Sequence, residues 1–377
     1  ANAAMKRSIS KISSGPDRGT LRGLPGGPGP EMGKVIASLL AGCAKLERLD
    51  ISDNVITARG MEFIVAVLEK QDALKERLVE INFSNTHISG NVGERLANFL
   101  TKVVNDSRNH LASLKLQSNA FTLAACTLFA DFFRSATIHL VEVDLSHLKF
   151  PADAMDTLLT GMENNKTVTS LAISSNDIPS KLSKSLGRMV SNNAALQRLA
   201  LRNCSLDKTC VIAVGDGMAK NTSIIELDMA GNNLEAHAAG ASWETALRKN
   251  TTLTQLNFAA CNFDGDGIEH IATALKDNRT LQILQLDANY VGSRGLKKLG
   301  HGIKDNKTIR IVSLQDVDCK LKDTVAFLDE IGATSGLTTL DLRHNSELSH
   351  ASFDIVAQAH PSISIRYTPP KKTTPRS

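Results

Sequence analysis

The chain has 377 residues, of which 42% are hydrophobic and 22% charged, and its formal net charge is +4. Much of the basic excess lies near the two ends, which is unlike the basic stripe of a nucleic-acid-binding protein, so we expect no nucleic-acid partner. No apolar run is long enough to form a membrane-spanning helix. The six cysteines include no CxxC pair, a usage typical of the reduced cytoplasm.

Residues 1–30 contain the Gly- and Pro-rich stretch GPDRGTLRGLPGGPGP, which offers too little apolar surface to support a folded core. We therefore expect a disordered or linker lead-in over residues 1–30. The following EMGKVIASLLAGCA, residues 31–44, has the pattern of a helix that belongs to an incomplete first unit. A repeat domain is expected over residues 31–366.

One asparagine recurs with a fixed period in front of a run of apolar residues, and we call it the repeat asparagine. Its copies follow one another at intervals of about 28 residues, a period typical of leucine-rich repeats in which a short strand is followed by a return segment. The copies are Asn165, Asn193, Asn221, Asn250, Asn278 and Asn306. The corresponding units begin at Leu46, Leu78, Leu111, Leu140, Val168, Leu196, Ile224, Leu253, Leu281, Ile309 and Leu337.

The residue pattern of one repeat unit indicates why the unit must stack against adjacent units. Leu281, Leu284 and Leu286 have the spacing of a strand with its apolar side chains in one core layer, and Asn289 stands where the chain bends off that strand. Stacked copies of Asn289 would form a ladder, each amide bonding backbone groups in its own and the next coil. The ladder positions are Asn54, Thr86, Asn119, Leu148, Asn176, Cys204, Asn232, Cys261, Asn289, Val317 and Asn345. We expect irregular turns at Leu148 and Val317, because these residues break the ladder.

The return segment has a helical pattern. In GIEHIATALKDN, residues 267–278, an apolar stripe follows helical spacing at Ile268, Ile271, Ala272 and Leu275. The repeat asparagine comes at the helix end, where we expect it to adopt the left-handed conformation that stops a helix. Several repeat asparagines also stand in Asn-X-Ser/Thr sequons, but their periodic position favours a structural role over glycosylation.

Stacking of such units predicts an α/β leucine-rich repeat solenoid. We expect a horseshoe of about 11 repeats of about 28 residues, with parallel strands on the concave face and helices on the convex face, since helices are wider than strands. Beyond the repeats, residues 367–377 are expected to form a basic, Pro-containing disordered tail.

The sequence contains none of the common catalytic or phosphate-binding motifs and no metal-spaced Cys/His cluster, so we expect no enzyme, no catalytic residue, no cofactor and no metal ligand. DGDGIEH, residues 264–270, could suggest a cation or phosphate loop, but a turn leading into a helix explains it better. Trp243 aligns with the buried helix stripe, which favours core packing over an interaction anchor.

The variable strand positions carry the candidate partner-binding residues. They are net acidic, with acidic, basic and acidic bands in turn, and the banded residues are Glu142, Asp144, Arg198, Arg202, Glu226 and Asp228. No aromatic residue occupies these positions, although tight interfaces concentrate their binding energy in Trp, Tyr and Arg. An ordinary solvated face without a partner is the alternative interpretation.

Phrases such as LDISDNVITARGMEFI, IIELDMAGNNL and LQLDANYVGSRGLKKL resemble the ribonuclease-inhibitor-like class of leucine-rich repeats. Within that class, NTSIIELDMAGN and TLTQLNF are most similar to the repeat domain of CARMIL proteins, scaffolds that regulate actin-capping protein. The resemblance implies a non-enzymatic, cytoplasmic protein-binding scaffold of actin assembly, associated with the cytoskeleton or the membrane through other domains.

A second resemblance is to Ran GTPase-activating protein, which has similar repeats and would imply a small GTPase as the partner. That family carries a strongly acidic tail after its repeats, whereas this chain ends in the basic KKTTPRS. We therefore rank the Ran-type activity, or another leucine-rich repeat adaptor function, below the scaffold of the CARMIL type.

Overall fold

The structure is a computed structural model, and it describes residues 18–20, 30–42, 46–106, 108–133, 139–234, 236–332, 335–345, 348 and 351–368. The chain divides into two compact units, Ala1–Asp177 (unit 1) and Ile178–Ser377 (unit 2), and we describe each by itself. Most of the lead-in, Cys43 and the tail from residue 369 onward lie outside the described residues.

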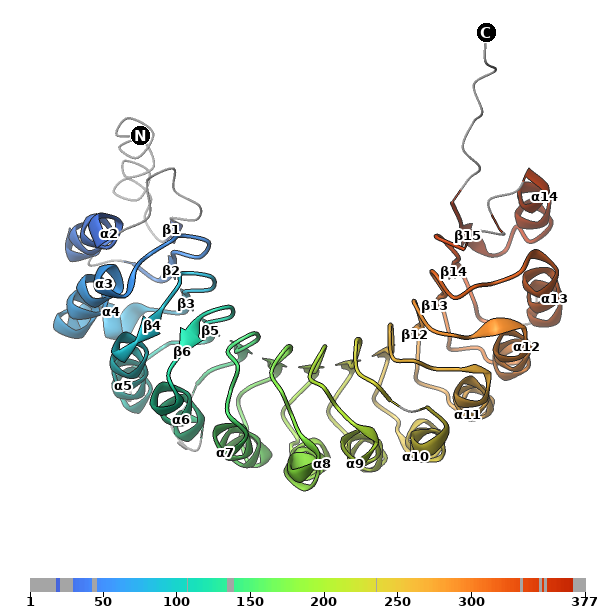
Figure 1. Ribbon diagram of the computed structural model, residues 1–377, viewed down its shortest axis with the longest axis horizontal. Coiled ribbons are helices and arrows are strands. Elements are labelled where there is room, and N and C mark those ends of the chain that lie inside the picture. The colour runs from blue at the N-terminus through green and yellow to red at the C-terminus, as the bar shows by residue number, and fades with distance from the viewer. Residues whose placement is uncertain are drawn as a thin grey trace, which may run out of the picture. The chain divides into compact units, whose positions relative to one another are not determined.

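In unit 1 short parallel strands form one layer and helices form the other (Figure 1). The paired strands, in order, are β1 (Arg18–Thr20), β2 (Arg48–Asp50), β3 (Glu80–Asn82), β5 (Ser113–Lys115), β7 (Glu142–Asp144) and β8 (Ser170–Ala172). The helices are α2 (Pro30–Gly42), α3 (Ala58–Lys70), α4 (Asp72–Arg77), α5 (Asn91–Asn105), α6 (Leu123–Phe132) and α7 (Ala152–Glu163). A small parallel pair, β4 (Ser89–Gly90) and β6 (Ala120–Phe121), joins two turns. Strand β1 was not expected within the lead-in.

Unit 2 repeats the same two-layer plan. Its strands are β9 (Arg198–Ala200), β10 (Glu226–Asp228), β11 (Gln255–Asn257), β12 (Ile283–Gln285), β13 (Ile311–Ser313), β14 (Thr339–Asp341) and β15 (Ser364–Arg366), paired in parallel in that order. Its helices are η1 (Ser180–Leu182), α8 (Ser183–Asn192), α9 (Lys208–Met218), α10 (Ala236–Lys249), α11 (Gly265–Leu275), α12 (Gly292–Ile303), α13 (Leu321–Ile331) and α14 (Ala351–Ala359). The predicted leucine-rich repeat solenoid with parallel strands is confirmed.

The core lies between the two layers, where the sequence pattern placed it. Leu284 is the middle residue of β12 and stands in register between Leu256 and Val312 of the adjacent strands, and all three side chains are buried. Every residue of the predicted stripe on α11 is also buried. Stacking therefore supplies each coil with the apolar wall that it cannot build alone.

A ladder asparagine bonds the turns of two successive coils. The prediction of irregular turns at Leu148 and Val317 is therefore wrong. The Leu148 N–H and the Phe150 N–H donate to Asn176 Oδ1 of the next coil, at 3.2 Å each. Asn176 Nδ2 donates to the carbonyls of Leu145 and Ile173, so one amide bonds the turns of two coils. Asn119, Asn232, Asn289 and Asn345 serve the turns at Thr86, Cys204, Cys261 and Val317 in the same way.

The coils without a ladder asparagine also share a backbone conformation. The residue after the ladder position has a positive φ in each of them, at His87, Lys149, Ser205, Asn262 and Asp318. Turns at Leu148 and Val317 therefore match those at Thr86, Cys204 and Cys261. The ladder needs an asparagine in every second coil only, because each asparagine reaches back to the preceding turn.

The expectation that the repeat asparagine stops a helix in the left-handed conformation is also wrong. Asn193 has φ −71° and ψ 120°, an extended conformation. In Asn250 the side-chain oxygen accepts from the backbone N–H of Thr252 and Leu253, and Nδ2 donates to the carbonyls of Met218 and Asn221 in the preceding coil. These amides form a second cross-coil ladder. The repeat asparagines are buried, which agrees with a structural role for them rather than with glycosylation.

Candidate functional site

Two of the predicted site residues lie on β7 of unit 1. Glu142 forms an ion pair with Lys115 Nζ at 3.2 Å and accepts a hydrogen bond from the Ser113 hydroxyl at 3.1 Å. Asp144 Oδ1 accepts the Ser146 N–H at 2.9 Å. Asp144 therefore shapes the turn as well as facing outward from the strand.

The other four lie on two adjacent coils of unit 2, with Arg198, Glu226 and Asp228 on strands β9 and β10 and Arg202 in the turn after β9. Glu226 stands in register opposite Arg198, and Arg202 Nη1 lies 3.3 Å from Asp228 Oδ2. Both arginines are exposed. Exposed ion pairs contribute less than about 1 kcal/mol to stability, so a partner can replace them at little cost. The structure brings these four residues together and leaves Glu142 and Asp144 as a separate group in unit 1.

A structural role for the strand-end acids was missed at the level of sequence. Asp228 Oδ1 accepts the Ala230 N–H at 3.0 Å, as Asp144 does with Ser146, and bonds of this kind close the turn two residues after the strand. The same bond occurs at Asp50, Asn82, Asn257 and Asp341. Recurrence of Asp or Asn as the last strand residue was the available signal.

The structure also has a groove in unit 2, which lies outside the variable strand positions considered in the sequence. It lies where the chain leaves β12, β13 and β14, and its volume is about 280 Å³. We call it the exit groove, and its lining residues are Ala288, Asn289, Tyr290, Asp316, Val317, Asp318, His344 and Asn345. The Tyr290 side chain is 74% exposed. Tyr290 was overlooked because it follows the ladder position and is not part of the strand.

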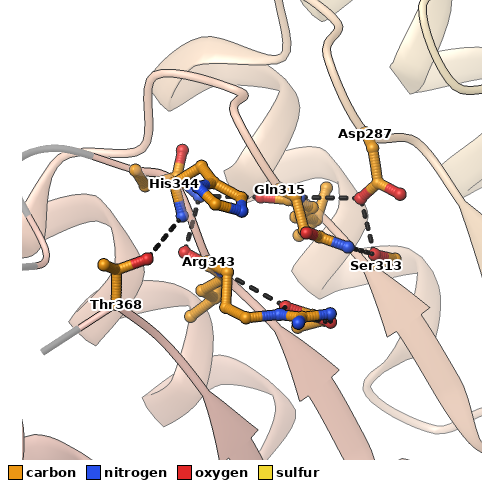
Figure 2. Close-up of polar contacts among 10 residues, drawn as sticks. Asp287, Ser313, Gln315, Arg343, His344 and Thr368 are labelled. Atoms are coloured by element: carbon orange, nitrogen blue, oxygen red, sulfur yellow. Dashed lines mark hydrogen bonds and ion pairs between the residues drawn. The ribbon is translucent and has the colours of Figure 1, made fainter.

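Polar contacts fix the strands and turns beside the exit groove (Figure 2). Asp287 Oδ1 accepts from the Ser313 hydroxyl at 2.5 Å and from the Gln315 N–H at 2.8 Å. The His344 N–H donates to Thr368 Oγ1 at 2.9 Å, and Arg343 is held by Asp341. The Asp287 bonds link the coil of β12 to the coil of β13, and the Thr368 bond links the coil of β14 to the segment after β15.

Four buried cysteines have thiols that are not activated for nucleophilic chemistry. Burial raises the pKa of Cys126 to about 11 and the pKa of Cys210, Cys261 and Cys319 to about 12, so these thiols stay protonated near neutral pH. In the described part of the chain, no group of three or more His, Cys, Asp or Glu residues is placed to hold a metal ion. The described helices are also too short or too polar to cross a bilayer.

Two structural interpretations from the sequence are confirmed. Asp264 Oδ1 accepts the Gly267 N–H at 2.9 Å and caps α11, so DGDGIEH is a turn into a helix. Trp243 is buried and meets Phe258 edge-on, with ring centroids 4.7 Å apart. Trp243 is thus a core residue, unavailable to a partner.

Comparison with known proteins agrees with the repeat architecture. The family model described as "Leucine Rich repeat" matches residues 42–65 and 249–272. Protein CARMIL of Dictyostelium discoideum is 23% identical over 236 residues, which cover 60% of this chain and 22% of that protein. Ribonuclease inhibitor of Sus scrofa is 24% identical over 258 residues, which cover 60% of this chain and 55% of the inhibitor.

Among solved structures, a chain of the Rad7 and Elc1 complex of yeast matches with a TM-score of 0.56 at 14% identity. That match covers 87% of this chain and 77% of the yeast chain, and it concerns the fold alone. The chain spans about a fifth of the length of CARMIL and about half of the length of ribonuclease inhibitor. The chain thus carries leucine-rich repeats and is similar, at low identity, to CARMIL and to ribonuclease inhibitor.

Proposed function

We propose that this leucine-rich repeat protein is a non-enzymatic scaffold of actin assembly of the CARMIL type, acting in the cytoplasm near the cytoskeleton or the membrane. The similarity to CARMIL extends over 60% of the chain and supports the comparison with a scaffold. Buried thiols with raised pKa values and the lack of a metal-binding group among the described residues give no support to a catalytic role.

The observation that carries the proposal is the set of exposed charges on the strand face. In unit 2, Arg198 on β9 and Arg202 in the turn after it are exposed; Glu226 stands in register opposite Arg198, and Asp228 pairs with Arg202. A partner that carries carboxylates can exchange the Arg202–Asp228 surface pair for an interfacial one, since surface pairs hold each other weakly. Glu142 and Asp144 offer a similar, separate acidic group in unit 1.

The test is a co-precipitation of the tagged full chain with capping protein and actin, quantified by mass spectrometry. Reversal of charge in Arg198→Glu/Arg202→Glu should reduce recovery of the partner by roughly tenfold or more, since like charges would then face it. Lys208→Glu/Lys220→Glu, which makes the same charge change at exposed positions of the helix layer of unit 2, serves as the control. Equal recovery with both double variants would reject the strand face and direct attention to the helices.

A single assay distinguishes the Ran-type GTPase-activating function from the scaffold proposal. A GTPase-activating protein accelerates hydrolysis by about 10³- to 10⁵-fold. We expect the purified chain to leave GTP hydrolysis by Ran unchanged. Stimulation of that size would replace the scaffold proposal with the GTPase one.

A further inference from the structure

We propose that the exit groove of unit 2 binds an arginine-bearing segment of a partner protein, with the guanidinium held between the Tyr290 ring and the carboxylates of Asp316 and Asp318. The groove lies beyond the strand face, and none of its residues belongs to the strand-face proposal. Three features carry this inference: two uncompensated carboxylates, an exposed aromatic ring and a rigid floor.

The carboxylates of Asp316 and Asp318 flank Val317 and are exposed. Within the described residues, neither carboxylate takes part in a hydrogen bond or an ion pair. Side chains at the same edge of other coils pair with each other instead. Asn85 Nδ2 donates to Asp53 Oδ1 at 3.1 Å, and Asn262 Nδ2 donates to Asn233 Oδ1 at 3.2 Å. The coil of Asp316 thus presents two carboxylates that no described residue of a neighbouring coil pairs with.

Tyr290 supplies the second feature. Large apolar side chains exposed in the described residues are Val55, Leu123, Val141, Ile225 and Tyr290, and Tyr290 is the aromatic one. Its position in the coil corresponds to Asp318 of the next coil, and both line the groove. Tyrosine is enriched among the residues that dominate binding energy, and its ring face attracts cations. An aromatic ring beside carboxylates suits a planar guanidinium better than a compact ammonium.

The floor of the groove holds its shape without a partner. It contains the ladder residues Asn289 and Asn345, which are 3% and 2% exposed. Asn289 Nδ2 donates to the carbonyls of Phe258 and Leu286 at 2.8 Å each, and Asn345 Nδ2 makes the equivalent bonds to Leu314 and Leu342. A preformed floor reduces the conformational entropy lost on binding.

The charge of the residues that line the groove determines which charge a bound partner segment should carry. Among the described residues of the lining, the titratable ones are Tyr290, Asp316, Asp318 and His344, and none is a lysine or an arginine. An acidic segment would meet like charge there, whereas an arginine would be attracted from a distance and then paired at contact. The groove therefore favours a basic segment over acidic or neutral ones.

The test uses the full chain and a fluorescein-labelled Gly-Ser peptide that carries arginines, with lysine and glutamate peptides of the same length for comparison. Fluorescence anisotropy at low ionic strength measures each Kd. We expect the arginine peptide to bind more tightly than the lysine peptide, the glutamate peptide to fail, and added salt to weaken binding. Absence of binding by the arginine peptide, or equal binding by all three, would overturn the proposal.

Conservative variants locate the binding. Asp316→Asn/Asp318→Asn should weaken the arginine peptide roughly three- to tenfold. Tyr290→Ala should weaken it roughly two- to fivefold, while Tyr290→Phe keeps the ring and the affinity. The control Asp305→Asn/Asp329→Asn removes the same charge from exposed positions at the helix layer of unit 2 and should leave Kd unchanged. If the control weakened binding as much as the groove variant, the attraction would be general and the assigned groove wrong.

The outcome is independent of the proposed function. Arg198→Glu/Arg202→Glu should leave binding of the arginine peptide in place, because these residues do not line the groove. Loss of peptide binding in that variant, with Asp316→Asn/Asp318→Asn unaffected, would move the basic-segment site to the strand face and overturn the assignment.

Discussion

A ladder asparagine joins two coils with a single side chain. Asn289 Oδ1 accepts from the N–H groups of Cys261 and Phe263, and its Nδ2 donates to carbonyls in its own and the preceding turn. Each of these backbone groups is buried and would be costly to leave unpaired. At this scale, the buried amide stabilises the stack more directly than the surface ion pairs do.

Removal of this amide should therefore destabilise unit 2. Asn289→Ala leaves several buried backbone groups without partners, and we expect a loss of about 2–4 kcal/mol in the free energy of unfolding. Urea unfolding followed by circular dichroism measures the loss. Asn233→Ala is the matched control, because the exposed side chain of Asn233 only accepts a surface hydrogen bond from Asn262 Nδ2 among the described residues. Equal shifts in the two variants would show that the ladder is not a main source of stability.

The sequence predicts buried residues well and polar partners poorly. Leu281, Leu284 and Leu286 were identified from spacing alone, because burial follows directly from which side of a strand a residue occupies. Cross-coil bonding by the ladder was expected, but the use of an asparagine in only every second coil was not, although the alternation of asparagine with other residues is visible in the sequence. Its meaning depends on where the neighbouring N–H groups point, and that depends on the stacked turns.

Elements are predictable to the extent that they repeat. Helix α11 and strand β12 follow from periodic spacing, whereas β1 lies in a segment without the repeat pattern and the short α4 has no counterpart in the other described coils. The distance between helices also escapes a sequence pattern. A Cβ added to Gly302 in α12 would lie 2.3 Å from the Ala272 carbonyl oxygen in α11, so these two helices approach closely only because residue 302 is glycine.

This close approach gives a prediction for the helix layer. Gly302→Ala should lower the free energy of unfolding by roughly 1–3 kcal/mol, since backbone atoms of α11 cannot give way as a flexible side chain could. Alanine is the better helix former by about 1 kcal/mol, so the net loss reports the clash. Gly42→Ala is the control, because a Cβ there meets nothing within 4 Å and should leave stability unchanged or slightly raised. Thermal melts of both variants compare the two effects. A neutral Gly302→Ala would mean that the helices can separate freely.

On the scale of the whole chain, periodicity predicts the architecture but not the partner. The strand-face charges were identified from the sequence, yet some of them also close turns, and whether they bind a partner stays a prediction. The exit groove could not be found from spacing, because it combines side chains from the turns of successive coils. A binding surface in a repeat protein is set by the residues that depart from the repeat, such as Tyr290 among the turn positions.

A solenoid should also fail locally when one coil is damaged, because each coil contacts mainly its neighbours. Leu284→Asp places an uncompensated charge in the core at a cost of several kcal/mol. We expect hydrogen exchange with mass spectrometry to show lost protection in β11, β12 and β13 and in the helices that cover them. Gln282→Asp adds the same charge at an exposed position of the same coil and should change little. Unit 1 should keep its protection in both variants, since both strands paired with β12 belong to unit 2. Equal loss of protection in unit 1 would contradict a fold held together by neighbouring coils and would require cooperative unfolding of the entire chain.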